Sequence, residues 1–206
     1  HRAGSLPIDE HDALALRVAA EGSVLLTNDG ILPLAGTERV ALLGAFAELI
    51  DAGTVRAIGA SNYSAGRLAE ALRVADEKGL PRFTAMQPEL NVLDRAQYEG
   101  ALRQLCIDEG LGVVTYFSLA SGYLSGKYRS IDDIGGRARG PRVKPYLDGK
   151  GPAVLAVMDR IAGETGATLS QIALAWVAAQ PGITAPIASA TSVDQLDEII
   201  DSETLA

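Results

Sequence analysis

Polar side chains that could hold a ligand follow two segments that read as buried strands. Ser61 and Asn62 come directly after the first segment, and Gln87 ends the second. Parallel α/β sheets and barrels collect ligands at the carboxyl ends of their strands, so these three residues are candidates for a binding site. Serine and asparagine also begin helices, and the alternative is that Ser61 and Asn62 only cap the helix that starts at Ser64.

A long loop between residues 118 and 151 is the most basic part of an acidic chain. The formal net charge of the whole chain is −8. This balance argues against nucleic acid and against an anionic membrane surface, because both need clustered Lys and Arg, and we expect neither as a partner. The basic residues of the loop could face an anionic ligand or, as the alternative, only solvent. They are Lys127, Arg129, Arg137, Arg139, Arg142 and Lys144.

Common catalytic and metal-binding patterns are missing from the sequence. There is no G-x-S-x-G elbow, H-E-x-x-H helix or P-loop. The only histidines are His1 and His11, and a single cysteine, Cys106, gives neither a disulfide nor a metal cluster. Cys106 lies among apolar residues of a helical pattern, which predicts a core thiol. We therefore expect no metal site and assign no catalytic residue.

Length and composition fit one full-sized domain, or one and a half small ones. The chain has 206 residues, of which 48% are hydrophobic. No apolar run is long enough for a membrane span and no signal-peptide pattern opens the chain, so we expect a cytoplasmic protein. The chain begins at His1 rather than at Met, as a piece of a longer protein would.

Short apolar segments alternate with longer helical patterns, which predicts a parallel sheet with right-handed crossovers. An eight-stranded barrel needs more strands and typically about 250 residues, so we predict an α/β fold that is a partial, half TIM-type barrel. A capping box, Thr168 with Gln171, marks one helix start. The five predicted strands are 40–44, 55–60, 83–87, 112–116 and 183–187, and the predicted helices are 8–26, 46–51, 64–78, 95–109, 153–165, 169–179 and 193–200.

Four motifs, spread in order over about 160 residues from Phe46 to the C-terminus, resemble the aldo-keto reductase family. The resemblance implies the second half of that family's barrel, strands five to eight, and a nicotinamide dinucleotide, NADP or NAD, as the small-molecule partner. The motifs are Val55-Arg56-Ala57-Ile58-Gly59-Ala60-Ser61-Asn62-Tyr63, Gln87-Pro88-Glu89-Leu90-Asn91, residues 112–122 with Gly126-Lys127-Tyr128, and residues 186–192 with Gln195-Leu196.

Site residues are implied by this resemblance, residue by residue. Ser61, Asn62 and Gln87 would fix the nicotinamide carboxamide, and Tyr116 would stack on the nicotinamide ring, with a core tyrosine as the alternative. Ser118, Leu119, Ser121 and Lys127 would hold the pyrophosphate, and Ser189, Ala190, Thr191, Ser192 and Gln195 the adenosine end.

The sequence departs from the family pattern in two of these motifs. Phe117-Ser118 stands where many members have a small or polar residue followed by proline, so the loop is expected to be less rigid. Thr191-Ser192 stands where the family commonly has Lys or Arg to pair with a 2′-phosphate. The choice between NADP and NAD therefore stays open.

The family's catalytic tetrad of Asp, Tyr, Lys and His belongs to the first four strands, which this sequence does not provide. Residues 1–45 instead resemble the linker and opening strand of the second domain of family 3 glycoside hydrolases, with Thr27 where that family usually has Lys. The two resemblances together predict a chimera, with the reductase-like half barrel over residues 46–206.

Three functions follow as hypotheses. The first is a reductase fragment that binds a dinucleotide and has little or no carbonyl reductase activity. The second is a non-catalytic chimeric structural domain, and the third is a recruited promiscuous hydrolase. A half barrel leaves two sheet edges open, so we also expect a homodimer formed through these edges.

Overall fold

The computed structural model describes residues 38–135 and 140–205, which fall into two units. The first unit covers residues 1–56, and its described part, residues 38–56, contains helix α2 (Glu38–Asp51). The predicted strand at 40–44 is wrong, because these residues lie inside α2. A short apolar run of Ala and Leu fits a helix as well as a strand, and both residue types favour the helix. The helix predicted for residues 8–26 lies outside the described residues.

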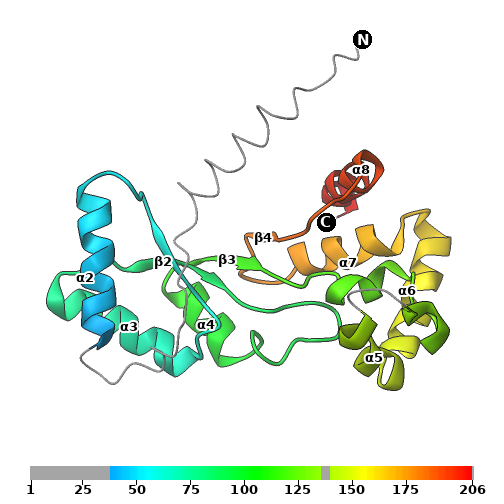
Figure 1. The fold of residues 1–206 in the computed structure, drawn as a ribbon, viewed down its shortest axis with the longest axis horizontal. Coiled ribbons are helices and arrows are strands. Elements are labelled where there is room, and N and C mark those ends of the chain that lie inside the picture. Colours follow the sequence, from blue (N-terminus) through cyan, green and yellow to red (C-terminus); the bar gives the residue numbers. More distant parts are fainter. Residues whose placement is uncertain (1–37, 136–139, 206) are drawn as a thin grey trace, which may run out of the picture. The chain divides into compact units, whose positions relative to one another are not determined.

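The second unit, residues 57–206, is built on a parallel four-stranded sheet (Figure 1). The strands are β1 (Ile58–Ser61), β2 (Phe83–Gln87), β3 (Gly112–Thr115) and β4 (Ala185–Pro186), and they pair in the order β1-β2-β3-β4. The structure therefore has four of the five predicted strands among its described residues. Alternating helices around a parallel sheet confirm the α/β fold and are consistent with a partial TIM-type barrel.

Helix α3 (Ala65–Lys78) connects β1 to β2 and has the ends that its sequence predicts. The Ser64 hydroxyl accepts a hydrogen bond from the Arg67 N–H at 3.3 Å, and Gly79 ends the helix with φ 61°. Helix α4 (Ala101–Asp108) is shorter than the predicted helix at 95–109. The difference arises at Gly100, whose φ of 90° does not fit an α-helix, so residues before it form turns.

The segment predicted as one loop, 118–151, contains three short helical elements. They are η1 (Ala120–Ser125), η2 (Ile131–Ile134) and α5 (Gly140–Asp148). Helices α6 (Gly151–Thr165) and α7 (Leu169–Ala178) follow, then β4, α8 (Val193–Asp201) and η3 (Ser202–Leu205). Thr168 and Gln171 form the predicted capping box at the start of α7.

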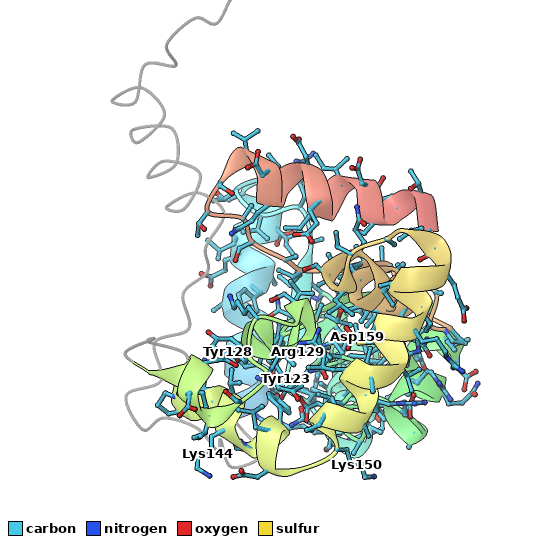
Figure 2. All side chains as sticks on the ribbon, turned by 90° about the vertical axis from the view of Figure 1, so that its right-hand side faces the viewer. Tyr123, Tyr128, Arg129, Lys144, Lys150 and Asp159 are labelled. Atoms are coloured by element: carbon cyan, nitrogen blue, oxygen red, sulfur yellow. The ribbon has the colours of Figure 1, made fainter. Side chains whose placement is uncertain are left out.

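A hydrophobic core is formed by residues of η1, α5, α6 and α7. Figure 1 shows these three α-helices gathered at one end of the second unit. Arg129 reaches from the segment after η1 to α6 and donates to both carboxylate oxygens of Asp159, at 2.7 and 2.8 Å (Figure 2). This core and this ion pair fix the segment that the resemblance assigns to the pyrophosphate. The buried core residues are Ala120, Tyr123, Leu124, Tyr128, Val143, Leu155, Met158 and Ala173.

Cys106, on α4, is buried with 1% of its surface exposed. Burial disfavours the thiolate and raises the pKa of Cys106 to about 11, as a core thiol requires. We expect the folded chain to react with an aromatic disulfide reagent at pH 8 more than about 100-fold slower than the denatured chain. Absorbance of the released thiolate measures both rates, and equal rates would show that the thiol is accessible.

Candidate functional site

Residues at the carboxyl ends of β1, β2 and β3 are joined by hydrogen bonds. The Ser61 hydroxyl donates to the Gln87 backbone carbonyl at 3.0 Å and lies 3.3 Å from Gln87 Oε1. The Tyr116 hydroxyl donates to Asn62 Oδ1 at 2.7 Å. These four residues are the strand-end cluster. Since Ser64 caps α3, the capping alternative for Ser61 and Asn62 is wrong.

Asn62 is held in an uncommon backbone conformation, with φ 58°. Asparagine tolerates the left-handed region better than most residues, and residues in it often lie at functional sites. Tyr116, the partner of Asn62, is half-buried rather than a fully buried core residue. Burial first, and then the charge of Glu89, raise the pKa of Tyr116, so its hydroxyl stays protonated and donates at neutral pH.

A cleft of about 660 Å³ begins at Tyr116 and runs between the segment after β3 and the segment from β4 to α8. This volume is in the range of small-molecule and cofactor sites. The cleft brings together segments about 70 positions apart in sequence. Its lining residues are Tyr116, Phe117, Ser118, Leu119, Ser121, Gly122, Ser125, Lys127, Arg142, Ser170, Ile187, Ala188, Ser189, Thr191, Gln195, Glu198 and Ile199.

The turn after β3 forms one wall of the cleft and is conformationally strained. Phe117, Ala120 and Ser121 have φ values of 55°, 48° and 57°, which non-glycine residues rarely adopt. The fully buried Asn91 supports this turn, because its Nδ2 donates to the Phe117 carbonyl at 3.2 Å. Asn91 Nδ2 also donates to Asp94 Oδ2 at 3.0 Å. Asn91 therefore couples the segment after β2 to the cleft wall.

Two cations, Lys127 and Arg142, line the cleft. The ammonium of Lys127 lies beside Gly122, where an added Cβ would be 3.0 Å from both Cε and Nζ of the lysine. The Arg142 guanidinium lies 5.6 Å from the centre of the Phe117 ring. Glycine at position 122 thus leaves room for the Lys127 side chain beside the serine residues that line the cleft.

Most of the predicted site residues line this cleft. They are Tyr116, Ser118, Leu119, Ser121, Lys127, Ser189, Thr191 and Gln195. Ser61, Asn62 and Gln87 lie in the strand-end cluster, which adjoins the cleft because Tyr116 belongs to both.

Several of the predicted hydroxyls are engaged within the protein. Ser192 is not among the lining residues and instead caps α8, where its Oγ accepts from the Gln195 N–H at 3.3 Å. The Ser118 and Thr191 hydroxyls bond to Thr115 and Gln195, so they hold the cleft walls in place.

Sequence reasoning missed several lining residues: Phe117, Gly122, Ser125, Arg142, Ser170, Ile187, Ala188, Glu198 and Ile199. Arg142 carried a signal as part of the basic loop, and Phe117, Gly122, Ile187 and Ala188 lie within the motifs that resemble the family, although none of them was assigned to the site. Ser170 and Glu198 come from α7 and α8, and nothing in their local sequence distinguishes them from ordinary helical residues. Arg137 and Arg139, from the same basic loop, lie outside the described residues.

The sequence pattern of the aldo/keto reductase family matches residues 28–205, which is most of the chain. The chain belongs to the aldo/keto reductase family. It is 35% identical over 164 residues to "Protein tas" of Escherichia coli (strain K12), covering 78% of this chain and 46% of that protein. It is 31% identical over 163 residues to the "Probable voltage-gated potassium channel subunit beta" of Arabidopsis thaliana, covering 73% and 47% of the two chains.

A third relative is the "Pyridoxal reductase, chloroplastic" of Arabidopsis thaliana. It is 28% identical over 164 residues, which cover 78% of this chain and 43% of the relative. The chain thus spans about half the length of these curated relatives. The described four-stranded sheet is likewise half of an eight-stranded barrel.

The described residues contain neither a candidate metal site nor a candidate membrane-spanning helix. Within 38–135 and 140–205, no three side chains of His, Cys, Asp or Glu lie together as ligands for a metal ion. None of the helices in these ranges combines the length and the apolar composition of a membrane span.

Proposed function

We propose that this member of the aldo/keto reductase family binds a nicotinamide dinucleotide along the cleft and the strand-end cluster. One observation carries the proposal: Tyr116 lines the cleft and also donates its hydrogen bond to Asn62 at 2.7 Å. The residues that the family resemblance assigns to nicotinamide therefore adjoin those that it assigns to pyrophosphate. A nicotinamide dinucleotide supplies a hydride when bound, and the protein's task is to orient it.

The residues present fit such a ligand. Lys127 and Arg142 offer two positive charges for a pyrophosphate, and charge-assisted hydrogen bonds are stronger than neutral ones. Tyr116 and Phe117, whose ring centres are 5.1 Å apart, offer aromatic surface at one end. The space beside Gly122 keeps the ammonium of Lys127 within the cleft. The donor set thus matches an anionic ligand with flat rings.

The end of the cleft that the resemblance assigns to the adenosine is negatively charged, unlike the part lined by Lys127 and Arg142. Residues 161–206 contain no Lys or Arg, and Glu198 lines the cleft near Gln195. A carboxylate repels a 2′-phosphate but accepts hydrogen bonds from free ribose hydroxyls. This charge supports NADH, rather than NADPH, as the dinucleotide of the proposal.

Little or no carbonyl reduction is expected from this chain, as part of the same proposal. No described residue is assigned as a proton donor. Tyr116 is engaged with Asn62, and its pKa is raised. General-acid catalysis typically accelerates a reaction about 10²- to 10⁴-fold. Without a proton donor, carbonyl reduction should be slower by that factor, so dinucleotide binding is the property to measure. The reductase activity named for the Arabidopsis relative is a property of a protein about twice as long.

The test is a titration of the full chain with NADH and NADPH, following cofactor fluorescence and melting temperature together. We expect saturable binding and a rise in melting temperature, because a ligand that binds only the folded state stabilises it. Asn62→Ala and Gln87→Ala should each weaken binding about 3- to 30-fold, because each leaves a polar group unpaired. Gln104→Ala, on the exposed side of α4, is the matched control and should bind like the unaltered chain. A cooperatively folded chain that binds neither dinucleotide would overturn the proposal.

The resemblance of residues 1–45 to family 3 glycoside hydrolases stays a prediction, as does the chimera that it implies. The aldo/keto reductase match begins at residue 28, so residues 28–45 fall within that match as well. None of the relatives found supports the glycoside hydrolase resemblance. Amplifying the coding region from source DNA across codon 45 tests whether the junction between the two segments is natural. A single uninterrupted product is expected if the junction is natural.

A further inference from the structure

Two serine hydroxyls face the cleft without a hydrogen-bond partner among the described residues. Ser121, in η1, is 8% exposed, and Ser170, in the first turn of α7, is 5% exposed. Both residues line the cleft, so the cleft is where a ligand can reach either hydroxyl. Polar groups that are more than nine-tenths buried normally have a partner, and two without one indicate a ligand that accepts their hydrogen bonds.

Ser170 also marks the N-terminus of α7, where backbone N–H groups are free. The Thr168 hydroxyl accepts from the Gln171 N–H at 3.2 Å. The N–H groups of Leu169 and Ser170 have no acceptor within the described part of the chain. The first turn of α7 also has no acidic side chain that could occupy this position. Free N–H groups at a helix N-terminus favour an anion, such as a phosphate group.

Lys127 brings a positive charge close to this N-terminus. An added Cβ at Gly126 would collide with Cδ1 of Leu169, so glycine is what allows α7 to approach the end of η1. The next residue in each segment, Lys127 and Ser170, lines the cleft. No carboxylate of the described residues forms an ion pair with the Lys127 ammonium. Its charge is therefore available to an anionic ligand.

The opposite side of the α7 N-terminus is acidic. Thr168 and Gln171 line a second pocket together with carboxylates of α8, which are Asp194, Asp197, Glu198 and Asp201. These carboxylates repel an anion from that side. An anion at the start of α7 therefore fits only the side of Ser170 and Lys127.

We propose that Ser170 and the first turn of α7 bind a phosphate group, together with Ser121 and Lys127. The family resemblance assigns the pyrophosphate to the segment after β3 and assigns no residue of α7, so α7 adds a second wall to this part of the cleft. The inference rests on the proposed dinucleotide function only for the source of the phosphate. Because none of these four groups needs a nicotinamide or adenine ring, inorganic pyrophosphate should bind by itself and compete with the dinucleotide.

The test titrates the full chain with inorganic pyrophosphate and, separately, with NADH at low salt, using calorimetry and melting temperature. Ser170→Ala should weaken the binding of both ligands roughly 10-fold, because it removes a hydrogen bond to a charged group. Ser202→Ala is the matched control. Ser202 is 6% exposed, does not line the cleft and donates its hydroxyl to the Ile199 carbonyl at 2.6 Å, so its replacement should leave both affinities unchanged.

A second variant, Ser170→Asp, tests the charge of the ligand. It should weaken the binding of both ligands more than about 100-fold, because a carboxylate repels a phosphate group. A negative charge at a helix N-terminus favours the helix, so α7 should still form. Ala153→Asp adds the same charge to the first turn of α6, where Ala153 is exposed and does not line the cleft, and should leave both affinities unchanged. Circular dichroism checks that each variant is folded.

Hydrogen exchange locates the ligand at α7. The amides of Leu169 and Ser170 should exchange more slowly with pyrophosphate bound. No binding of pyrophosphate, unchanged affinity in both Ser170 variants, or unchanged exchange at these amides would each overturn the inference. NADH binding that ignores both variants would overturn this inference alone. Pyrophosphate binding that depends on Ser170, in a chain that does not bind NADH, would overturn only the dinucleotide proposal.

Discussion

Replacing Lys127 by methionine is expected to weaken dinucleotide binding about 10- to 100-fold, because a hydrogen bond to a charged group contributes about 1.5–3 kcal/mol. Lys127 lines the cleft beside Gly122, and methionine keeps the length of the side chain without its charge. Fluorescence titration with NADH at low salt measures the change. The difference should shrink at high salt, which screens exposed charges.

Lys150→Met is the matched control for this variant. Lys150 is exposed, precedes α6 and does not line the cleft, so its replacement should leave the dissociation constant unchanged. Equal weakening in the two variants would mean that the net charge of the chain, rather than the cleft, determines the affinity. An unchanged affinity in Lys127→Met would show that Lys127 does not contact the pyrophosphate, and it would contradict the proposed position of that group in the cleft.

Gly151→Ala is expected to destabilise the fold by about 2–3 kcal/mol, as overpacking of a tight site typically does. An added Cβ at position 151 would lie 2.6 Å from Cε1 of Tyr123, and the backbone carbonyl of Tyr146 is also too close. Tyr123 is fully buried, so neither neighbour can move freely. Thermal unfolding should show a melting temperature lower by about 5–10 °C.

Gly163→Ala in the same helix should have the opposite effect. An added Cβ at position 163 meets nothing within 4 Å, and alanine in a helix interior is about 0.5–1 kcal/mol more favourable than glycine. The pair separates packing from helix propensity, because both substitutions are identical and lie in α6. If Gly151→Ala were as stable as Gly163→Ala, the packing of Tyr123 against the start of α6 would have to be looser than the structure has it.

Elements with strong local signals were predictable from the sequence. Ser64 and Gly79 bound α3, and Thr168 with Gln171 begins α7, because each of these signals depends on hydrogen bonds within a few residues. The strand at Phe83–Gln87 has its predicted bounds. The errors fall where local signals are weak, as in the segment at 40–44, whose apolar residues suit a helix and a strand alike.

The candidate site also has a part that the sequence predicted and a part that it could not predict. The sequence placed Ser61, Asn62, Gln87 and Tyr116 at strand ends, and the parallel alternation of strands and helices already implied that these ends would meet. It could not show that Asn62 bonds to Tyr116 rather than capping α3. Asn62 and Tyr116 are far apart in the chain, and their contact depends on the order and register of β1, β2 and β3.

The sequence by itself determined the α/β class, the family motifs and the helix ends, since these rest on residue types at short, fixed spacings. Only the tertiary structure decided that Arg142 of α5 and Glu198 of α8 line one cleft with Tyr116. These residues come from segments that are far apart in the second unit's sequence. Their positions follow from how the helices pack on the sheet and where its edges lie, which no local pattern encodes.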